Sequence, residues 1–411
     1  MKLKNATWAL ADQALVSGSS FLLNVLLARL LGLEQFGIYS LLLLAHLFCA
    51  GLQNAIIISP MMTLGQKSQN GYYANVLLMQ AVLAASLGLV MYFSLLLIIN
   101  YTTALVSASF SLFIVAKQLH EFMRKYFYAR AQSKYHFSFT LDSVYLVVAV
   151  PIIIYLSVHK QLTLNSVFFT LCFALTASLF SLIMFRGHMG FGFGCPKASI
   201  GRIAKKHYSF GKWLTAQLII QWIGTNYYYV VAAAVFGPVA TGALKAAQNI
   251  AGAINVLFLA IENVVPAQAS KIFFQQGNEQ FNIYLTRIFL CGVGLTLAVS
   301  VVIAFSSEWL MPLVYGDEYR QYAPLLVSYS FYYVIIFLPL LLRIKLRSLE
   351  FTRPIFTSYI ITFVMSLLIA KFVISHLGLH GAILGMSVQQ IVATIWLYVA
   401  CSKSEKQRVV I

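Results

Sequence analysis

Long apolar blocks dominate this chain, and they constrain its fold more than any other feature. Most run for about 20 residues or more, the length that a helix needs to cross the hydrocarbon core of a membrane. Only 9% of the residues are charged, well below the roughly 25% typical of a soluble domain. The blocks also lack the polar–apolar alternation of barrel strands. We therefore predict an all-α polytopic membrane protein with about twelve transmembrane helices.

A long polar break divides the chain almost in half. The expected spans lie near residues 8–31, 39–64, 74–99, 104–123, 137–158, 162–185, 208–235, 238–266, 285–306, 322–343, 355–375 and 380–401. Between the sixth and the seventh lies a segment rich in glycine and basic residues. We predict an N-terminal six-helix bundle at 1–185, a cytoplasmic linker at 186–207 and a C-terminal six-helix bundle at 208–411.

The two halves share sequence landmarks that indicate an internal repeat. An even number of spans in each half makes the halves parallel, related by an axis along the membrane normal. The matched pairs are Gly32 with Gly237, Gly37 with Gly242, Pro60 with Pro266, and Arg124 with Arg343.

The net charge of +17 reflects membrane orientation rather than nucleic-acid binding. Most Lys and Arg residues lie in the N-terminal tail and in the loops on the same side, which places both termini in the cytoplasm. The first span carries Asp12 and Gln13 and is too polar for a cleaved signal. The five cysteines have no paired spacing, so we expect no disulfide framework and no metal site. The few basic residues of the opposite side are Arg29, Lys160, Arg320 and Lys371.

The eighth span carries the most informative polar face. Ionisable groups within a span are costly, so each is a functional candidate. At 100° per residue the polar side chains of this span fall within one arc of the helix. The face lines a water-filled cavity or forms an interhelical hydrogen-bond seam, and we favour the cavity because a lysine and a glutamate on one helix need solvation. Its residues are Lys245, Gln248, Asn249, Asn255, Glu262 and Asn263.

Weaker polar faces lie on the spans that the repeat makes equivalent. The first span contributes Asn24, the second Gln53 and Asn54, and the seventh Gln217 and Gln221. Polar and small residues at helical spacing also form packing seams. For the first two spans, cavity and seam remain equal alternatives.

Several charged or aromatic residues have two interpretations each. Arg29 projects away from the polar face of its helix and either snorkels to the interface or lines the cavity. Asp12 and Asp142 are candidate proton or coupling-ion sites, as is Glu262, although either aspartate also fits a hydrogen-bonding cap. Glu121 and Arg124 have the spacing of an intrahelical ion pair. The run 227–229 of three tyrosines is interpreted as part of an interfacial aromatic belt rather than as a platform for stacking sugars.

Three segments resemble a known family. They are Ala28–Ser40 in the first outer hairpin, Glu121–Lys134, which begins Glu-Phe-Met-Arg and continues with a basic run, and Tyr315–Leu326. Together they resemble the O-antigen flippase-like (Wzx-like) polysaccharide transporters of the multidrug/oligosaccharidyl-lipid/polysaccharide exporter superfamily. The resemblance implies two six-helix bundles in a V around a cavity lined by spans 1, 2, 7 and 8. It also implies flipping of a polyprenyl-diphosphate-linked oligosaccharide from the inner to the outer leaflet.

The expected function is therefore transport rather than catalysis, without cofactor or nucleic acid. The implied partners are the lipid-linked glycan, membrane lipids and, as an open alternative, other polysaccharide-assembly proteins. We expect a monomer in the bacterial cytoplasmic membrane. Two alternatives remain: a cation-coupled multidrug exporter of the same fold, which would need acidic cavity residues, and a glycan polymerase or acyltransferase, which would need a catalytic outer loop. Lys245 is the deepest charge that the sequence places.

Overall fold

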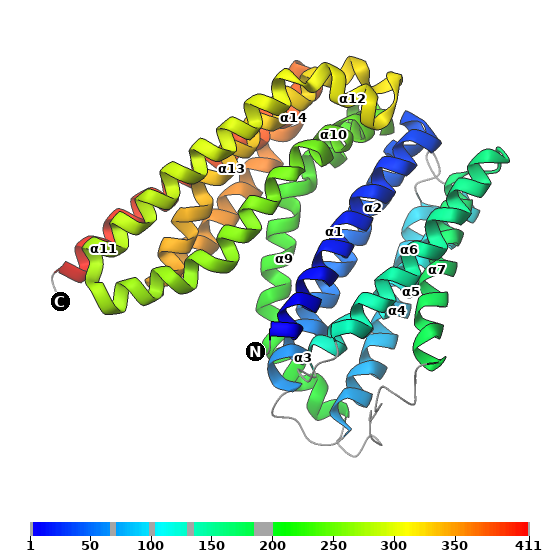
Figure 1. Ribbon diagram of the computed structural model, residues 1–411, viewed down its shortest axis with the longest axis horizontal. Coiled ribbons are helices and arrows are strands. Elements are labelled where there is room, and N and C mark those ends of the chain that lie inside the picture. Colours follow the sequence, from blue (N-terminus) through cyan, green and yellow to red (C-terminus); the bar gives the residue numbers. More distant parts are fainter. Residues whose placement is uncertain (1–2, 66–70, 98–102, 130–134, 185–199, 410–411) are drawn as a thin grey trace. The chain divides into compact units, whose positions relative to one another are not determined.

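The computed structural model describes residues 3–65, 71–97, 103–129, 135–184 and 200–409, and no strand occurs within these ranges (Figure 1). This confirms the predicted all-α membrane fold. The first half contains α1 (Leu3–Leu31), α2 (Leu33–Gln53), the π-helix η1 (Asn54–Ile58), α3 (Ser59–Leu64), α4 (Tyr72–Leu96), α5 (Ala104–Ala129), α6 (Tyr135–Val158) and α7 (Leu164–Met184).

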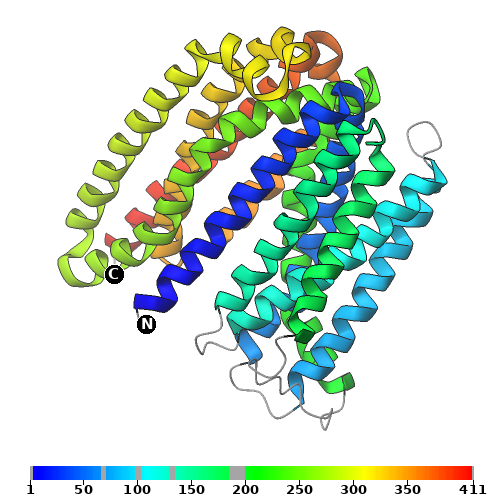
Figure 2. The same ribbon diagram turned by 45° about the vertical axis from the view of Figure 1, so that its right-hand side comes forward.

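The second half contains longer helices, two of which are interrupted by a glycine. Gly277 in α11 has a φ of 84° and Gly378 in α14 a φ of 61°, and at both points the helix breaks. Figure 2 shows α11, in yellow-green, turning back on itself at its break. The elements are α9 (Ile200–Phe236), α10 (Pro238–Ala251), η3 (Gly252–Ile254), α11 (Asn255–Phe305), α12 (Ser307–Tyr315), η4 (Asp317–Tyr322), α13 (Ala323–Ser348) and α14 (Arg353–Val409).

Ten described helices are long and apolar enough to cross a membrane. Two facts reconcile them with twelve expected spans. The candidate Arg353–Lys403 has 51 residues and contains the break at Gly378, so it supplies two spans. Helix α5 is not among the ten, because four of its side chains are charged. Its 26 residues are nevertheless long enough to cross a hydrocarbon core about 30 Å thick at about 1.5 Å per residue, so it supplies the remaining span. The chain is a multi-pass membrane protein.

The chain forms two compact units, and each unit contains two separate segments of the sequence. One unit comprises Met1–Leu31 and Leu42–Leu218, and the other comprises Gly32–Leu41 and Ile219–Ile411. Helix α5 is the hub of the first unit, in contact with α4, α6 and α7, while α6 also packs against α1. Helix α13 is the hub of the second unit, in contact with α10, α11, α12 and α14. These hubs are the fourth spans of the two predicted halves.

The predicted domain boundary stays a prediction. Most of the expected linker at 186–207 lies outside the described residues, and α9 begins at Ile200.

Matched glycines of the proposed repeat meet in the second unit. Gly32 and Gly237, with φ values of 76° and 81°, each end a helix in a conformation that favours glycine. A Cβ at Gly242 would lie 2.9 Å from the Leu33 carbonyl oxygen and 3.1 Å from the Gly37 Cα, so α2 and α10 approach backbone to backbone here. Residues paired by sequence comparison are thus also paired in space, which supports the repeat.

Candidate functional site

A buried ionic cluster joins three helices of the first unit. The Arg124 guanidinium on α5 contacts the Asp12 carboxylate on α1 at 3.0 Å and the Asp142 carboxylate on α6 at 2.6 Å. A third carboxylate, Glu121, lies 2.7 Å away in the predicted intrahelical pair, which is confirmed. Asp12 and Asp142 are 0% and 4% exposed. One cation therefore ties α1, α5 and α6 together.

Neutral donors also contact the Asp12 carboxylate. Its Oδ2 accepts hydrogen bonds from the Tyr128 hydroxyl at 2.6 Å and from the Ser138 hydroxyl at 3.2 Å. Ion pairs and hydrogen bonds offset the cost of burying a carboxylate. Both aspartates that the sequence singled out as candidate proton sites are thus paired with Arg124, and the Oδ1 of Asp12 has no hydrogen-bond partner among the described residues.

A polar pocket lies beside the ionic cluster, within the first unit. It has a volume of about 260 Å³ and is formed by α2, η1 and α5. Two lysines one turn on either side of Glu121 contribute to its wall: Lys125, 3.7 Å from the Glu121 carboxylate, and Lys117, 5.3 Å from the centre of the Tyr145 ring. Its lining residues are His46, Ala50, Gln53, Asn54, Ile58, Lys117, Glu121 and Lys125.

The two carboxamides of the second span have different roles in this pocket. Gln53 is buried, and its Nε2 donates a hydrogen bond of 2.5 Å to the Gln118 carbonyl of α5. Asn54 is exposed and begins the π-helix. Short π-helical segments within α-helices are frequent at functional sites. Of the two predicted residues, Gln53 fixes α2 to α5, whereas Asn54 lines the pocket with an exposed side chain.

A histidine from α9 holds the irregular segment that follows. Pro60 lacks an N–H for the carbonyl of Ile56, four residues earlier. His207 Nδ1 donates to that carbonyl at 3.0 Å, and its Nε2 accepts from the Tyr72 hydroxyl at 2.9 Å. The carbonyl can only accept, so the proton belongs on Nδ1. The wall of the pocket is thereby anchored to α4 and α9.

In the second unit, Lys245 is enclosed by polar and aromatic groups. Its ammonium donates to the Gln248 carboxamide oxygen at 2.9 Å and lies 4.1 Å from the centre of the Tyr229 ring. The Tyr229 hydroxyl accepts a hydrogen bond from Tyr329 at 2.8 Å. A cation over an aromatic face is stabilised electrostatically. The structure therefore brings Lys245 and Gln248 together, as the shared helical face predicted.

The other predicted residues are more dispersed. Asn255 donates to the Tyr333 hydroxyl at 3.2 Å, and Asn24 to the Ser20 carbonyl at 2.7 Å within its own helix. The remaining candidates differ in how far they are buried. Gln217 and Asn249 are half-buried, whereas Arg29, Gln221 and Glu262 are exposed.

Sequence reasoning missed three members of these sites. Lys117 and Lys125 were not singled out as site residues, although their spacing from Glu121 puts all three on one face of a helix. The assignment of the tyrosine run to an interfacial belt was wrong for two of its residues. Tyr228 and Tyr229 are 0% and 1% exposed, because α9 packs this face into the second unit, where Tyr229 contacts Lys245.

The architecture matches transporters of the multidrug/oligosaccharidyl-lipid/polysaccharide (MOP) superfamily. The lipid II flippase MurJ, in an inward closed conformation, aligns with a TM-score of 0.74 and 14% identity over 96% of this chain and 87% of that chain. An inward-facing multidrug resistance MATE family transporter aligns with a TM-score of 0.72 and 13% identity over 98% and 96%. A Vibrio cholerae MATE transporter aligns with a TM-score of 0.62 and 13% identity over 99% of this chain and 99% of that chain. At these identities the likeness establishes the fold.

Sequence comparison supplies the family. No curated protein matches the chain significantly. The profile of a family described as "Polysaccharide biosynthesis protein" matches residues 2–271, well over half of the sequence. The chain therefore belongs to the polysaccharide biosynthesis protein family.

Proposed function

We propose that this protein flips a polyprenyl-diphosphate-linked oligosaccharide, an O-antigen, exopolysaccharide or capsule repeat unit, from the inner to the outer leaflet by alternating access. The observation that carries the proposal is the polar pocket of the first unit, where Lys117 and Lys125 stand beside carboxamides. Lys245 in the second unit adds a further cation at membrane depth. Membership of the family links the chain to polysaccharide biosynthesis.

The chemistry of the cargo suits these groups. A diphosphate and a string of sugars cannot cross hydrocarbon without polar partners, because each desolvated polar group costs several kcal/mol. Ammonium groups attract the phosphates, and the carboxamides of Asn54 and Gln217 offer both donors and acceptors to sugar hydroxyls. A polar path of this kind accommodates the headgroup while the polyprenyl tail stays in lipid.

The alternative of a cation-coupled drug exporter fits these sites less well. Such a protein binds cationic cargo and needs available carboxylates. In the first unit Asp12, Glu121 and Asp142 all contact Arg124. These three carboxylates are therefore already paired with a cation of the protein itself, rather than left for a cationic drug. We retain Asp12, Asp142 and Glu262 as candidate coupling sites.

The proposal includes a cellular setting. We place the chain as a monomer in the bacterial cytoplasmic membrane with both termini in the cytoplasm, in line with the distribution of Lys and Arg. Its partners are the lipid-linked glycan, the surrounding lipids and other polysaccharide-assembly proteins.

Depletion of the protein in its host tests the function. We expect lipid-linked repeat units to accumulate on the cytoplasmic side while surface polysaccharide falls, because their synthesis continues without translocation. Mass spectrometry of extracted lipids and staining of surface glycan provide the readouts. Unchanged surface glycan together with hypersensitivity to cationic drugs would instead identify a drug exporter.

Thiol labelling tests whether the polar faces border water. In a cysteine-free background, cysteines at Asn24 and Gln221 should react with a membrane-impermeant reagent. Matched cysteines at Leu23 and Ile220 should resist, since Leu23 is buried and Ile220 packs against a core cluster. Mass shifts on gels measure the reaction. Equal protection at all four positions would indicate a dry packing seam.

A further inference from the structure

Arg343 in α13 carries a positive charge without a carboxylate beside it. Its guanidinium lies over the Tyr359 ring of α14, 5.0 Å from the ring centre, and its Nε is buried without a hydrogen-bond partner among the described residues. No ion pair involves Arg343 in the part of the chain that the structure describes. Because a charge withdrawn from water is costly unless it is paired, this guanidinium calls for an anion that these residues do not supply.

The matched residue of the first half shows how such a cation is otherwise held. Arg124 and Arg343 each lie five positions before the last residue of their helix, Ala129 in α5 and Ser348 in α13. Arg124 is paired with three carboxylates. The matching positions of the second half are uncharged: Gln217 for Asp12, Leu340 for Glu121, and Ile360 or Ile361 for Asp142. The second half therefore has the arginine without its counter-charges.

A second arginine strengthens the need for an anion. Arg347 is exposed and lies one turn after Arg343 on the same face, a spacing at which like charges destabilise a helix. Its repulsion of Arg343 is stronger than the attraction exerted by the exposed Glu262 carboxylate. An anion bound by both guanidiniums would replace this repulsion with attraction.

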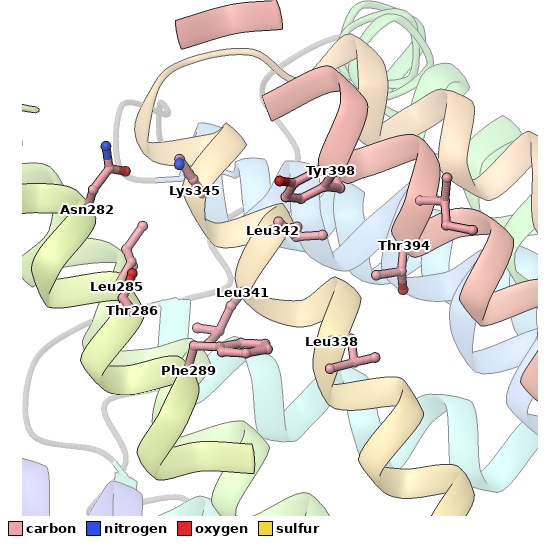
Figure 3. Close-up of a pocket in the computed structure, with 11 residues that line it drawn as sticks. Asn282, Leu285, Thr286, Phe289, Leu338, Leu341, Leu342, Lys345, Thr394 and Tyr398 are labelled. Atoms are coloured by element: carbon pink, nitrogen blue, oxygen red, sulfur yellow. The ribbon is translucent and has the colours of Figure 1, made fainter. Parts of the chain in front are cut away.

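The two arginines lie on a different face of α13 from the apolar groove of the same unit. This groove has a volume of about 490 Å³ and lies among α11, α13 and α14 (Figure 3). Helix α13 contributes Leu338, Leu341, Leu342 and Lys345 to its lining. At about 100° per residue, Arg343 lies about 150° around the helix from the middle of that face. A ligand of the arginines would therefore bind outside the groove.

The geometry of the two guanidiniums suits a diphosphate. A guanidinium is a planar fork that can donate two parallel hydrogen bonds to one phosphate. Tyr359 is buried in a core cluster, so its ring gives the Arg343 guanidinium a fixed support. Residues one turn apart on a helix are separated by about 5–6 Å, a gap that two linked phosphates can span. A single phosphate would leave one of the two arginines less well paired.

We propose that Arg343 and Arg347 form a phosphate-binding site for the diphosphate of the lipid-linked cargo at the inner leaflet. The inference rests on the proposed function and adds the place where the headgroup is bound before translocation. In the predicted orientation, the end of α13 that carries both arginines lies on the cytoplasmic side. Arg343 binds one phosphate from its support on Tyr359, and Arg347 binds the other.

Binding to the purified full-length protein in detergent tests the site. The probes are undecaprenyl diphosphate, dioleoylphosphatidylglycerol and inorganic pyrophosphate, and native mass spectrometry measures their retention. Undecaprenyl diphosphate should bind about tenfold more tightly than phosphatidylglycerol, because a second phosphate contact of about 1.4 kcal/mol gives that factor. Pyrophosphate should compete with it at high concentration, which shows that the phosphates, and not the chain alone, are recognised.

Four variants localise the binding. Arg343→Gln should weaken retention of undecaprenyl diphosphate by about tenfold or more. Arg343→Lys should weaken it less, because it keeps the charge but loses the planar fork. Arg347→Gln should remove the preference for the diphosphate over phosphatidylglycerol. The control is Arg353→Gln, which removes an exposed arginine at the start of α14 and should bind as wild type.

Thermal unfolding separates this role from a structural one. Without ligand, Arg343→Gln should unfold near the wild-type temperature, since no carboxylate loses its partner. Undecaprenyl diphosphate should raise the unfolding temperature of wild type by mass action, but not that of Arg343→Gln. A lower unfolding temperature of Arg343→Gln that undecaprenyl diphosphate still raises as in wild type would assign Arg343 to the fold. Arg347→Gln changes an exposed residue and keeps the test decisive if Arg343→Gln fails to fold.

Three further results would overturn the inference. These are unchanged retention of undecaprenyl diphosphate in both Arg343→Gln and Arg347→Gln, an equal loss in Arg353→Gln, which would indicate diffuse attraction, and preferential binding of phosphatidylglycerol, which would indicate a site for ordinary lipid. In each case the proposed function stands if depletion still makes lipid-linked repeat units accumulate. If wild type does not retain undecaprenyl diphosphate and depletion leaves the repeat units unchanged, the proposed function fails as well.

Discussion

Replacing Arg124 with glutamine should remove most of the folded protein from the membrane. The substitution leaves Asp12 and Asp142 buried without their cation, and breaking a buried ion pair in this way costs about 3–5 kcal/mol. That loss is a large fraction of the roughly 5–15 kcal/mol that stabilises a typical protein. Protein level in isolated membranes and the unfolding temperature in detergent measure the effect.

Two further variants identify the cause. Lys125→Gln removes a neighbouring cation whose contact with Glu121 is longer and partly exposed, so it should cost at most about 1 kcal/mol. Adding Asp142→Asn to Arg124→Gln should recover part of the protein level, because one uncompensated charge disappears. Normal levels of Arg124→Gln with transport lost would show that the cluster acts in transport and contributes little to folding.

The spans could be predicted because hydropathy alone determines where a helix must face lipid. The helix ends at Gly32 and Gly237 could also be predicted, because glycine permits the positive φ that is found at both positions. The repeat also paired Gly37 with Gly242 as equivalent positions, although only the structure shows that they are in contact. In each case the signal lies within a short stretch of sequence or within a comparison of two such stretches.

The pairing of charges could not be predicted from local sequence. Asp12 and Asp142 were recognised as costly groups at similar depth, but Arg124 was paired with Glu121 alone because only those two lie within one helical turn. The contacts from α1 and α6 depend on how α5 packs between its neighbours. Tertiary packing thus made a structural cluster from residues that looked like independent titration sites.

Other features have little or no sequence signature. The π-helix Asn54–Ile58 adds about one residue to a single turn, and the apolar residues 55–58 contain no polar side chain that would reveal the resulting shift in phase. The groove beside Lys345 is lined by ordinary apolar residues, whose sequence cannot show that α11, α13 and α14 leave space between them. Tyr229 was misassigned because an aromatic residue near a helix end serves equally at an interface or in a core.

Lys245 is where the largest effect on transport is expected. Its ammonium rests on the Tyr229 ring and donates to Gln248, so the fold can hold the charge within the membrane. Because Lys245 is held by these contacts, it has two alternative roles. It either stabilises the fold or attracts the diphosphate of the cargo. The two roles differ in whether protein level and transport fall together.

Three substitutions separate the roles of Lys245. Lys245→Gln should leave folded protein in the membrane yet lower surface glycan, since the lost cation–π contact is worth only about 0.5–2 kcal/mol. Lys245→Arg should keep substantial activity, because it retains the positive charge and can still lie over Tyr229. Lys245→Glu should lower surface glycan by about tenfold or more, because a change of about 1.4 kcal/mol in binding the anion already gives that factor. Lys371→Gln, at an exposed position of the same unit, is the control for charge loss. The ratio of surface polysaccharide to membrane protein level distinguishes the two roles. An unchanged ratio in Lys245→Glu would exclude attraction of the diphosphate. A parallel fall of surface polysaccharide and protein level in Lys245→Gln would show that Lys245 stabilises the fold.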